Sequence, residues 1–345
     1  MKKEILTIKN LLLIIVVPLV LYLLHILSFI FIPFVFGLFI ALLFSPLMRW
    51  FKRMGVPGFL GVITVFIIVS LGIMVTYKLV HLSSNELTKV NESFKPKLDE
   101  RLNEISKPIV QFMNINPRND ETDFKALLNS EEIKSQVFGK LGTGINIAGN
   151  VISMILMTLF FMVLFLAGTM DLQRLLELFI FKNQDAKINI FKKIEKDAFT
   201  YILIKTLISI STGVLISLSC YFFGISFPIF WGLVAFLLNF IQMIGSIVSV
   251  AALALFALVE LSFAGSFVFF VAVIIGIQFI LGNILEPILM GKSFSINTVA
   301  VLIMLAIWGF IWGIPGLILA VPISALLKRI FEQFPSTQIY AKAMS

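Results

Sequence analysis

Glu286 is the residue in the C-terminal half of the chain with the clearest potential for chemistry. It follows the apolar run 263–281 and directly precedes Pro287. A carboxylate in an otherwise apolar segment is energetically costly, so it is by default a functional candidate. It could carry a proton or a cation, with Lys292 as its candidate partner. The alternative is an interfacial carboxylate that caps a helix end, since Pro287 is expected to break the helix there.

A second group of polar residues lies inside the apolar run 227–259. Its members are small or amide side chains: Asn239, Gln242, Gly245 and Ser246. They offer donors and acceptors to a small polyol-like ligand. They could also satisfy the backbone of an interrupted helix, and the two roles are compatible. Gln278 and Asn283, five residues apart on the next apolar segment, are further candidates that could instead bridge neighbouring helices.

A third group interrupts the apolar run 298–327. Three glycines and a proline stand where a straight helix would have none: Gly309, Gly313, Pro315 and Gly316. We expect them to permit close approach and a tight turn at the site. Trp308 and Trp312 share a face if helical, and could stack on a ligand or mark a membrane interface. His25 and His81 have no partners nearby in the sequence and suggest no metal or proton-transfer role.

The composition identifies the environment in which these residues must work. Of 345 residues, 59% are hydrophobic and 13% charged, against roughly 25% charged in soluble domains. Long unbroken apolar runs, without the alternation of an outer-membrane barrel, predict an all-α polytopic membrane protein. The single cysteine, Cys220, excludes an intrachain disulfide. The net charge is +8, but in a membrane protein the basic residues set the orientation in the bilayer. Nucleic acid is not an expected partner.

The apolar runs predict about six full spans and two interrupted segments. The spans are expected at 11–32, 34–48 after a turn at Pro33, 57–80, 145–168, 201–223 and 263–281. Each interrupted segment is either a kinked full span or a re-entrant hairpin, the alternative being eight spans in all. Arms of about 13 residues, or roughly 20 Å, favour hairpins. Paired Gly/Pro-interrupted segments are typical of a transport site, which would lie between them and the span joining them.

The predicted organisation has five parts. Residues 1–80 form N-terminal spans, 81–144 a water-facing amphipathic insert, 145–200 a span and a cytoplasmic amphipathic helix, 201–327 the C-terminal core, and 328–345 a tail. Lys205 is close enough to the start of its span to snorkel to the interface. The basic residues gather on one side, which predicts cytoplasmic N- and C-termini.

The order of the C-terminal motifs resembles the AI-2E family of transporters. The resemblance is carried by Trp231-Gly232, Asn239-Phe240-Ile241, Ile244-Gly245-Ser246, Asn283-Ile284-Leu285-Glu286-Pro287, Gly291-Lys292-Ser293, Gly313-Ile314-Pro315-Gly316-Leu317 and Ala320-Val321-Pro322. Glu286 matches the family's Glu-Pro motif. The chain departs from the family at Gln242, where proline is usual, and near Ile296 and Asn297, where a His-Pro pair is often found.

The resemblance implies a secondary transporter of the bacterial inner membrane that forms a homo-oligomer. Members are associated with export of the signalling molecule autoinducer-2, and in some cases with sodium or lithium exchange for protons. We therefore expect proton-coupled export of autoinducer-2 or a similar small polar metabolite, with Na+(Li+)/H+ antiport as the alternative. A non-transporting scaffold is the third class, although a scaffold gains nothing from two interrupted segments.

Enzyme signatures and cofactor motifs are absent from the sequence. It has no Gly-Lys-Thr/Ser phosphate loop and no His-Glu-x-x-His pair, which argues against ATP-driven transport by this chain and against a metalloprotease. We therefore expect no enzymatic activity, cofactor or metal site, and partners limited to a small polar substrate or cation, membrane lipid and further copies of the chain.

Overall fold

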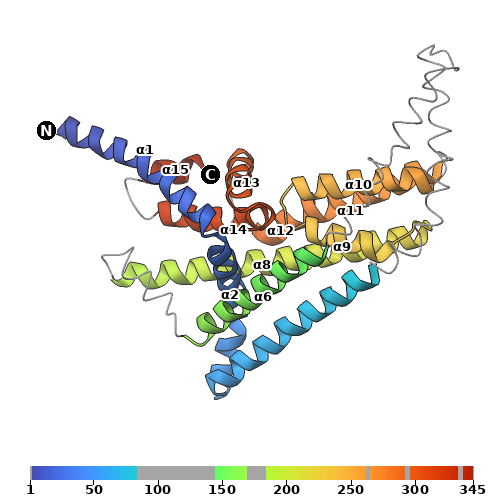
Figure 1. The fold of residues 1–345 in the computed structure, drawn as a ribbon, viewed down its shortest axis with the longest axis horizontal. Helices are drawn as coiled ribbons and strands as arrows, with labels where there is room; N and C mark the ends of the chain where they lie inside the picture. Colours follow the sequence, from blue (N-terminus) through green and yellow to red (C-terminus); the bar gives the residue numbers. More distant parts are fainter. Residues whose placement is uncertain are drawn as a thin grey trace, which may run out of the picture.

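The computed structural model of the chain describes residues 2–83, 144–168, 184–261, 265–291, 296–332 and 337–344. Within these ranges the regular elements are helices (Figure 1). The described helices that are long and apolar enough to cross a membrane are Ser28–Arg53, Gly58–Ser83, Glu195–Phe222, Gly265–Met290 and Ile314–Phe331. The chain is therefore a polytopic helical membrane protein, as predicted. The expected insert 81–144 lies almost entirely outside the described residues.

The N-terminal helices divide at Leu27. Helix α1 spans Lys2–Ile26 and α2 spans Ser28–Arg53, and Figure 1 shows the two running in different directions. The predicted turn at Pro33 is wrong, because Pro33 is buried inside α2. A proline removes one helical hydrogen bond, but neighbouring groups in a membrane protein can satisfy the freed carbonyl, so the helix continues through it.

Helix α2 packs tightly against α6, which spans Gly144–Leu166. The two backbones approach at Gly37, where an added Cβ would lie 2.9 Å from the backbone nitrogen of Met162. The helix Gly58–Ser83 joins this pair through a small buried cluster of Val65, Leu159 and Met162. These three helices form the N-terminal body of the molecule.

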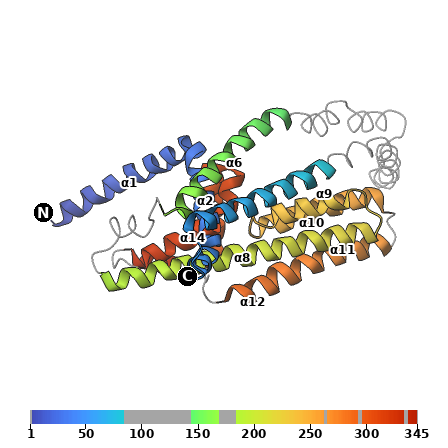
Figure 2. The same ribbon diagram turned by 90° about the horizontal axis from the view of Figure 1, so that it is seen from below.

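Helix α8 is the long axis on which the C-terminal half is built. It spans Gln184–Phe222, 39 residues, so the predicted surface helix continues without a break into the fifth span. Helices α9 (Pro228–Leu238) and α11 (Gly265–Gln278) lie beside it, and α10 (Ile244–Glu260) packs on α9 and α11 (Figure 2).

The first interrupted segment is a helical hairpin. Helices α9 and α10 are joined by residues 239–243, and the backbone nitrogen of Ser226 donates to Glu260 Oε2 at 2.5 Å, so their far ends meet. At the tip, a Cβ on Gly245 would lie 1.7 Å from the Leu238 carbonyl oxygen. Only glycine fits there, which explains why the break falls at this residue.

The second interrupted segment also folds back on itself. Helices α13 (Thr298–Trp312) and α14 (Ile314–Phe331) meet at Gly313, whose φ of 62° favours glycine. A Cβ on Gly316 would lie 1.9 Å from the Trp308 carbonyl oxygen, so α14 returns directly over the last turn of α13. Helix α15 (Gln338–Ala343) links the far ends, with Asn297 N donating to Met344 O at 2.9 Å.

The span between the hairpins is longer than predicted. It runs continuously from Gly265 to Met290 as α11, a π-helical segment η1 (Phe279–Leu285) and α12 (Glu286–Met290). The expectation that Pro287 ends the helix is therefore wrong. Proline is tolerated in the first turn of a helical segment, and the wider π turn precedes it, with Glu286 N donating to Leu281 O.

Candidate functional site

The centre of the site is a buried ion pair between α8 and α12. Lys205 Nζ lies 2.8 Å from Glu286 Oε1 and 3.0 Å from Oε2, so the ammonium faces both carboxylate oxygens. The two side chains are only 4% and 5% exposed. Removing two charges from water carries a desolvation penalty of several kcal/mol per ion, which only close geometry and mutual attraction can offset. Both residues lie in helices long and apolar enough to span a membrane.

The π-helical segment determines which way Glu286 faces. Gln278 and Glu286 are eight residues apart, and in a regular α-helix they would be offset by about 80° around the axis. A π turn accommodates one extra residue, which reduces this offset to about 20° in the other direction. Gln278 and Glu286 are in fact both buried, on the side of the helix turned to the protein.

Four polar side chains follow one face of α8 at intervals of three or four residues. This α8 stripe is entirely buried and consists of Tyr201, Lys205, Ser209 and Thr212. Its hydroxyl at Ser209 accepts a hydrogen bond from Asn239 Nδ2 at 2.9 Å. The tip of the first hairpin therefore reaches α8 one turn beyond the ion pair.

A second polar connection joins the hairpin to α11. Gln278 Nε2 donates to Ser249 Oγ at 3.2 Å, and Ser249 donates in turn to the Ser246 carbonyl at 3.0 Å. The Ser246 hydroxyl donates to the Met243 carbonyl at 2.9 Å. Within the described residues, the side-chain oxygens of Gln242 and Gln278 are buried and have no hydrogen-bond partner. Both oxygens are acceptors suited to a ligand hydroxyl or a small cation.

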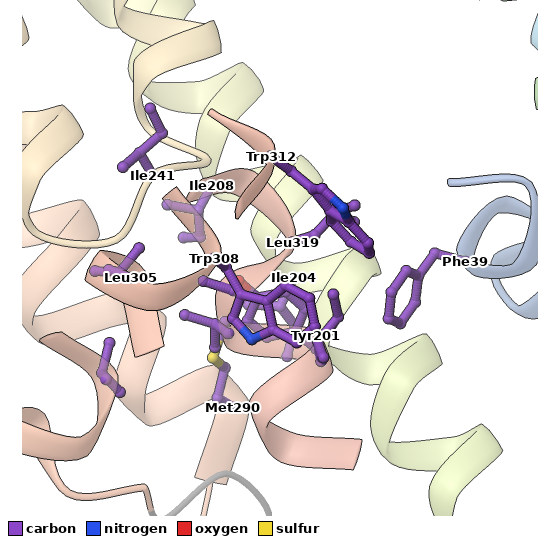
Figure 3. Packing of buried hydrophobic residues seen from close by; sticks show 14 of the residues in the cluster. Phe39, Tyr201, Ile204, Ile208, Ile241, Met290, Leu305, Trp308, Trp312 and Leu319 are labelled. Carbon is purple, nitrogen blue, oxygen red and sulfur yellow. The ribbon is translucent and has the colours of Figure 1, made fainter. Parts of the chain in front are cut away.

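An apolar cluster brings the two hairpin tips together beside α8 (Figure 3). Ile204 and Ile208 of α8 flank Lys205 in sequence and belong to this cluster. Ile241 enters it from the first tip, and Trp308 and Trp312 from the second, with ring centroids 4.8 Å apart. Both tryptophans are buried inside the protein, so the alternative of a membrane-interface position does not hold for them.

The structure brings some of the predicted site residues together and separates others. Asn239, Gly245, Gln278 and Glu286 are buried at the junction of the hairpins with α8 and α11–α12, and Gln242, Ser246 and Pro315 are half-buried. Asn283 and Gly313 are exposed. Lys292 lies outside the described residues.

Lys205 is the main functional candidate that the sequence prediction missed. It was expected to snorkel to the interface, which is wrong, because it is buried and paired with Glu286. A signal was available: Tyr201, Lys205 and Ser209 recur every four residues in an otherwise apolar run, which places them on one helix face.

Each charge of the pair depends on the other for compensation. Loss of the negative charge on Glu286 would leave the Lys205 ammonium, which lies 2.8 Å from Oε1 and 3.0 Å from Oε2, buried without its counter-charge. Amide and hydroxyl groups that can donate and accept hydrogen bonds lie within one turn on α8. Among the described residues there is no cluster of His, Cys, Asp and Glu that could hold a metal ion.

Comparison with known proteins agrees with the resemblance seen in the motifs. The family described as "AI-2E family transporter" matches residues 11–336. "AI-2 transport protein TqsA" of Escherichia coli is 27% identical over 314 residues, covering 91% of this chain and 89% of the relative. "Putative transport protein" of Haemophilus influenzae is 27% identical over 311 residues (90% and 88%), and "Putative transport protein YhhT" of E. coli is 26% identical over 301 residues (86% and 82%). The chain therefore belongs to the AI-2E family of transporters.

Proposed function

We propose that this chain is a secondary transporter that exports a small polar metabolite, and that Glu286 carries the proton to which export is coupled. The observation that supports this most directly is the buried Lys205–Glu286 pair at the junction of the two hairpins. Ionisable residues within membrane spans generally mark ion and proton pathways. The proposal includes a homo-oligomer in the bacterial inner membrane with both termini in the cytoplasm.

The coupling follows from the charge balance at the pair. While Glu286 is ionised, its charge and that of Lys205 compensate each other, so both can stay buried in the arrangement described above. Protonation of Glu286 leaves Lys205 as an uncompensated buried charge, and breaking such a pair typically costs about 3–5 kcal/mol. That exceeds the roughly 1–3 kcal/mol of typical coupling free energies, so it is enough to shift the hairpins to a second arrangement.

Autoinducer-2 is the first substrate to test. The relative TqsA is named an AI-2 transport protein, and the match covers most of both chains. The unpartnered oxygens of Gln242 and Gln278 would accept hydrogen bonds from ligand hydroxyls, and Asn239 and Ser246 would provide further polar contacts.

Sodium or lithium exchange for protons is the second candidate. The same carboxylate favours it, because Glu286 could hold either a proton or a small hard cation. In that case the cation would displace Lys205 from the carboxylate. A non-transporting scaffold is the least supported function, since it has no use for a buried charge pair that is costly to desolvate.

The experiment that separates these functions uses purified protein in liposomes that contain a pH-sensitive dye. Sodium and autoinducer-2 are added outside in parallel samples. Proton movement evoked by autoinducer-2 and lost in Glu286→Gln would support coupled export, whereas sodium-evoked movement lost in the same variant would assign the cation antiport. If neither autoinducer-2 nor sodium evokes proton movement, both candidate functions are contradicted.

A further inference from the structure

Two reciprocal hydrogen bonds join the last turn of α1 to the last turn of α13. The Nδ1 of His25 lies 2.7 Å from the Ile311 carbonyl oxygen, to which it donates. The indole Nε1 of Trp312 donates in the opposite direction, to the Leu24 carbonyl oxygen, at 2.9 Å. Each helix thus provides one side-chain donor and one backbone acceptor. The bonded residues are 286 and 288 positions apart in the sequence.

Both acceptors lie at helix ends, where carbonyls lack their usual partners. Helix α13 ends at Trp312, and the residue four positions after Ile311 is Pro315, which has no N–H to donate. Helix α1 ends at Ile26, so the Leu24 carbonyl is likewise in a final turn. Buried carbonyls without a donor are costly, and His25 and Trp312 supply the missing donors.

This contact fastens α1 to the apolar cluster of the second hairpin. Leu21 and Leu24 of α1 pack on the cluster, which contains Trp308 and Trp312. Helix α2 packs on α6 through the close approach at Gly37, and its Ile32 and Phe39 belong to the same apolar cluster. Leu27, where the chain changes direction, is the only residue between them.

We propose that His25 and Trp312 form a clamp that makes α1 move together with the tip of the second hairpin. His25 is then a positioning residue for transport, although it lies in the N-terminal part of the chain and its described hydrogen bond is to Ile311, not to Lys205 or Glu286. The role in transport rests on the proposed function, but the clamp itself does not.

Hydrogen–deuterium exchange of the full-length protein tests the clamp without relying on transport. His25→Leu removes the donor and leaves the Ile311 carbonyl without a partner, so amides in the segment 307–316 should exchange about tenfold faster. His25→Asn keeps an N–H donor close to the position of Nδ1 and should restore most of the protection. His81→Leu, the same change at a histidine outside this contact, is the matched control and should leave 307–316 unchanged.

Transport kinetics test the functional half of the proposal. His25→Leu should lower the maximal rate of transport about tenfold with little change in KM, because the clamp acts on the hairpin movement and not on the polar groups of the site. His25→Asn should recover the rate. Trp312→Phe should have a similar effect, and adding it to His25→Leu should lower the rate little further, because the two bonds work as a unit.

The outcomes separate the clamp from the proposed function. Unchanged exchange at 307–316 in His25→Leu would overturn the clamp. Faster exchange with an unchanged transport rate would show a simple helix cap and overturn its role in movement. Wild-type protein that moves neither sodium, autoinducer-2 nor protons would contradict the proposed function alone, and the exchange experiment would still decide the clamp.

Discussion

Two levels of α8 hold ion pairs in different environments. At the first, Glu195 bonds to Ser45 and Arg49, with side-chain exposures of 13% for Glu195 and 53% for Arg49. Ten residues further along, Lys205 and Glu286 form an ion pair with side-chain exposures of 4% and 5%. Pairs that are open to solvent contribute about 0–1 kcal/mol, whereas a buried pair is costly to break. Helix α8 therefore carries one pair whose cation is exposed to solvent and one buried pair, and only the buried pair carries the proposed coupling.

The largest expected effect comes from removing one member of the buried pair. Lys205→Met leaves the Glu286 carboxylate buried without its partner, so the free energy of unfolding should fall by about 3–5 kcal/mol. Denaturant unfolding in detergent measures this. Lys196→Met, at an exposed position of the same helix, is the control and should change stability by less than about 0.5 kcal/mol. An equal loss of stability in Lys205→Met and Lys196→Met would show that burial of the charge makes no difference.

Removing both charges should separate stability from coupling. In Lys205→Met/Glu286→Met two apolar side chains replace the pair, and such replacements are often neutral or stabilising. The double variant should therefore recover to within about 1–2 kcal/mol of wild type. Its proton-coupled flux in liposomes should stay absent. A double variant that is as unstable as Lys205→Met alone would show that the pair stabilises the fold by more than charge compensation.

A smaller effect is expected at the contact between the first hairpin tip and α8. Ser209→Ala leaves the buried Asn239 amide without its acceptor, which should lower the free energy of unfolding by about 1–3 kcal/mol. If Asn239 contacts substrate, KM should also change. Ser219→Ala is the control, because within the described part of the chain that hydroxyl donates to the Leu215 carbonyl of its own helix. If Ser209→Ala loses no more stability than Ser219→Ala, the hydrogen bond between Asn239 and Ser209 does not stabilise the fold.

The smallest effect is expected at the pair of Arg49 and Glu195, in which the Arg49 side chain is exposed to solvent. Arg49→Gln should lower stability by no more than about 1 kcal/mol, and the difference should shrink further at high salt because exposed charges are screened. Unfolding measured at low and high salt tests both statements. A loss of several kcal/mol that is insensitive to salt would place Arg49 in the same class as Lys205.

The sequence predicted the interruptions well because their cause is local. Gly245 and Gly316 stand where a Cβ would meet a backbone carbonyl, and Gly313 adopts a positive φ. Such requirements restrict the residue type itself, so they are visible in one sequence. Glu286 could be singled out for the same reason, since a carboxylate in an apolar run is conspicuous without any structure.

Features that depend on tertiary packing were not predictable in the same way. The partner of Glu286 lies 81 residues away on α8, and no local pattern indicates that distance. Pro287 was expected to break the helix, but the preceding π turn allows the helix to continue. Pro33 was expected to form a turn, but packing of α2 on α6 keeps it inside a helix, and the chain divides at Leu27.

The measurement that tests the central claim most directly is substrate efflux from liposomes with and without an imposed pH gradient. Wild-type efflux should accelerate when the gradient is imposed, and Glu286→Gln should lose this acceleration while remaining folded. Glu332→Gln, which neutralises the partner of Arg329 near the end of α14, is the matched control and should respond as wild type does. Efflux through folded Glu286→Gln that still depends on the gradient would contradict the assignment of proton coupling to the buried pair.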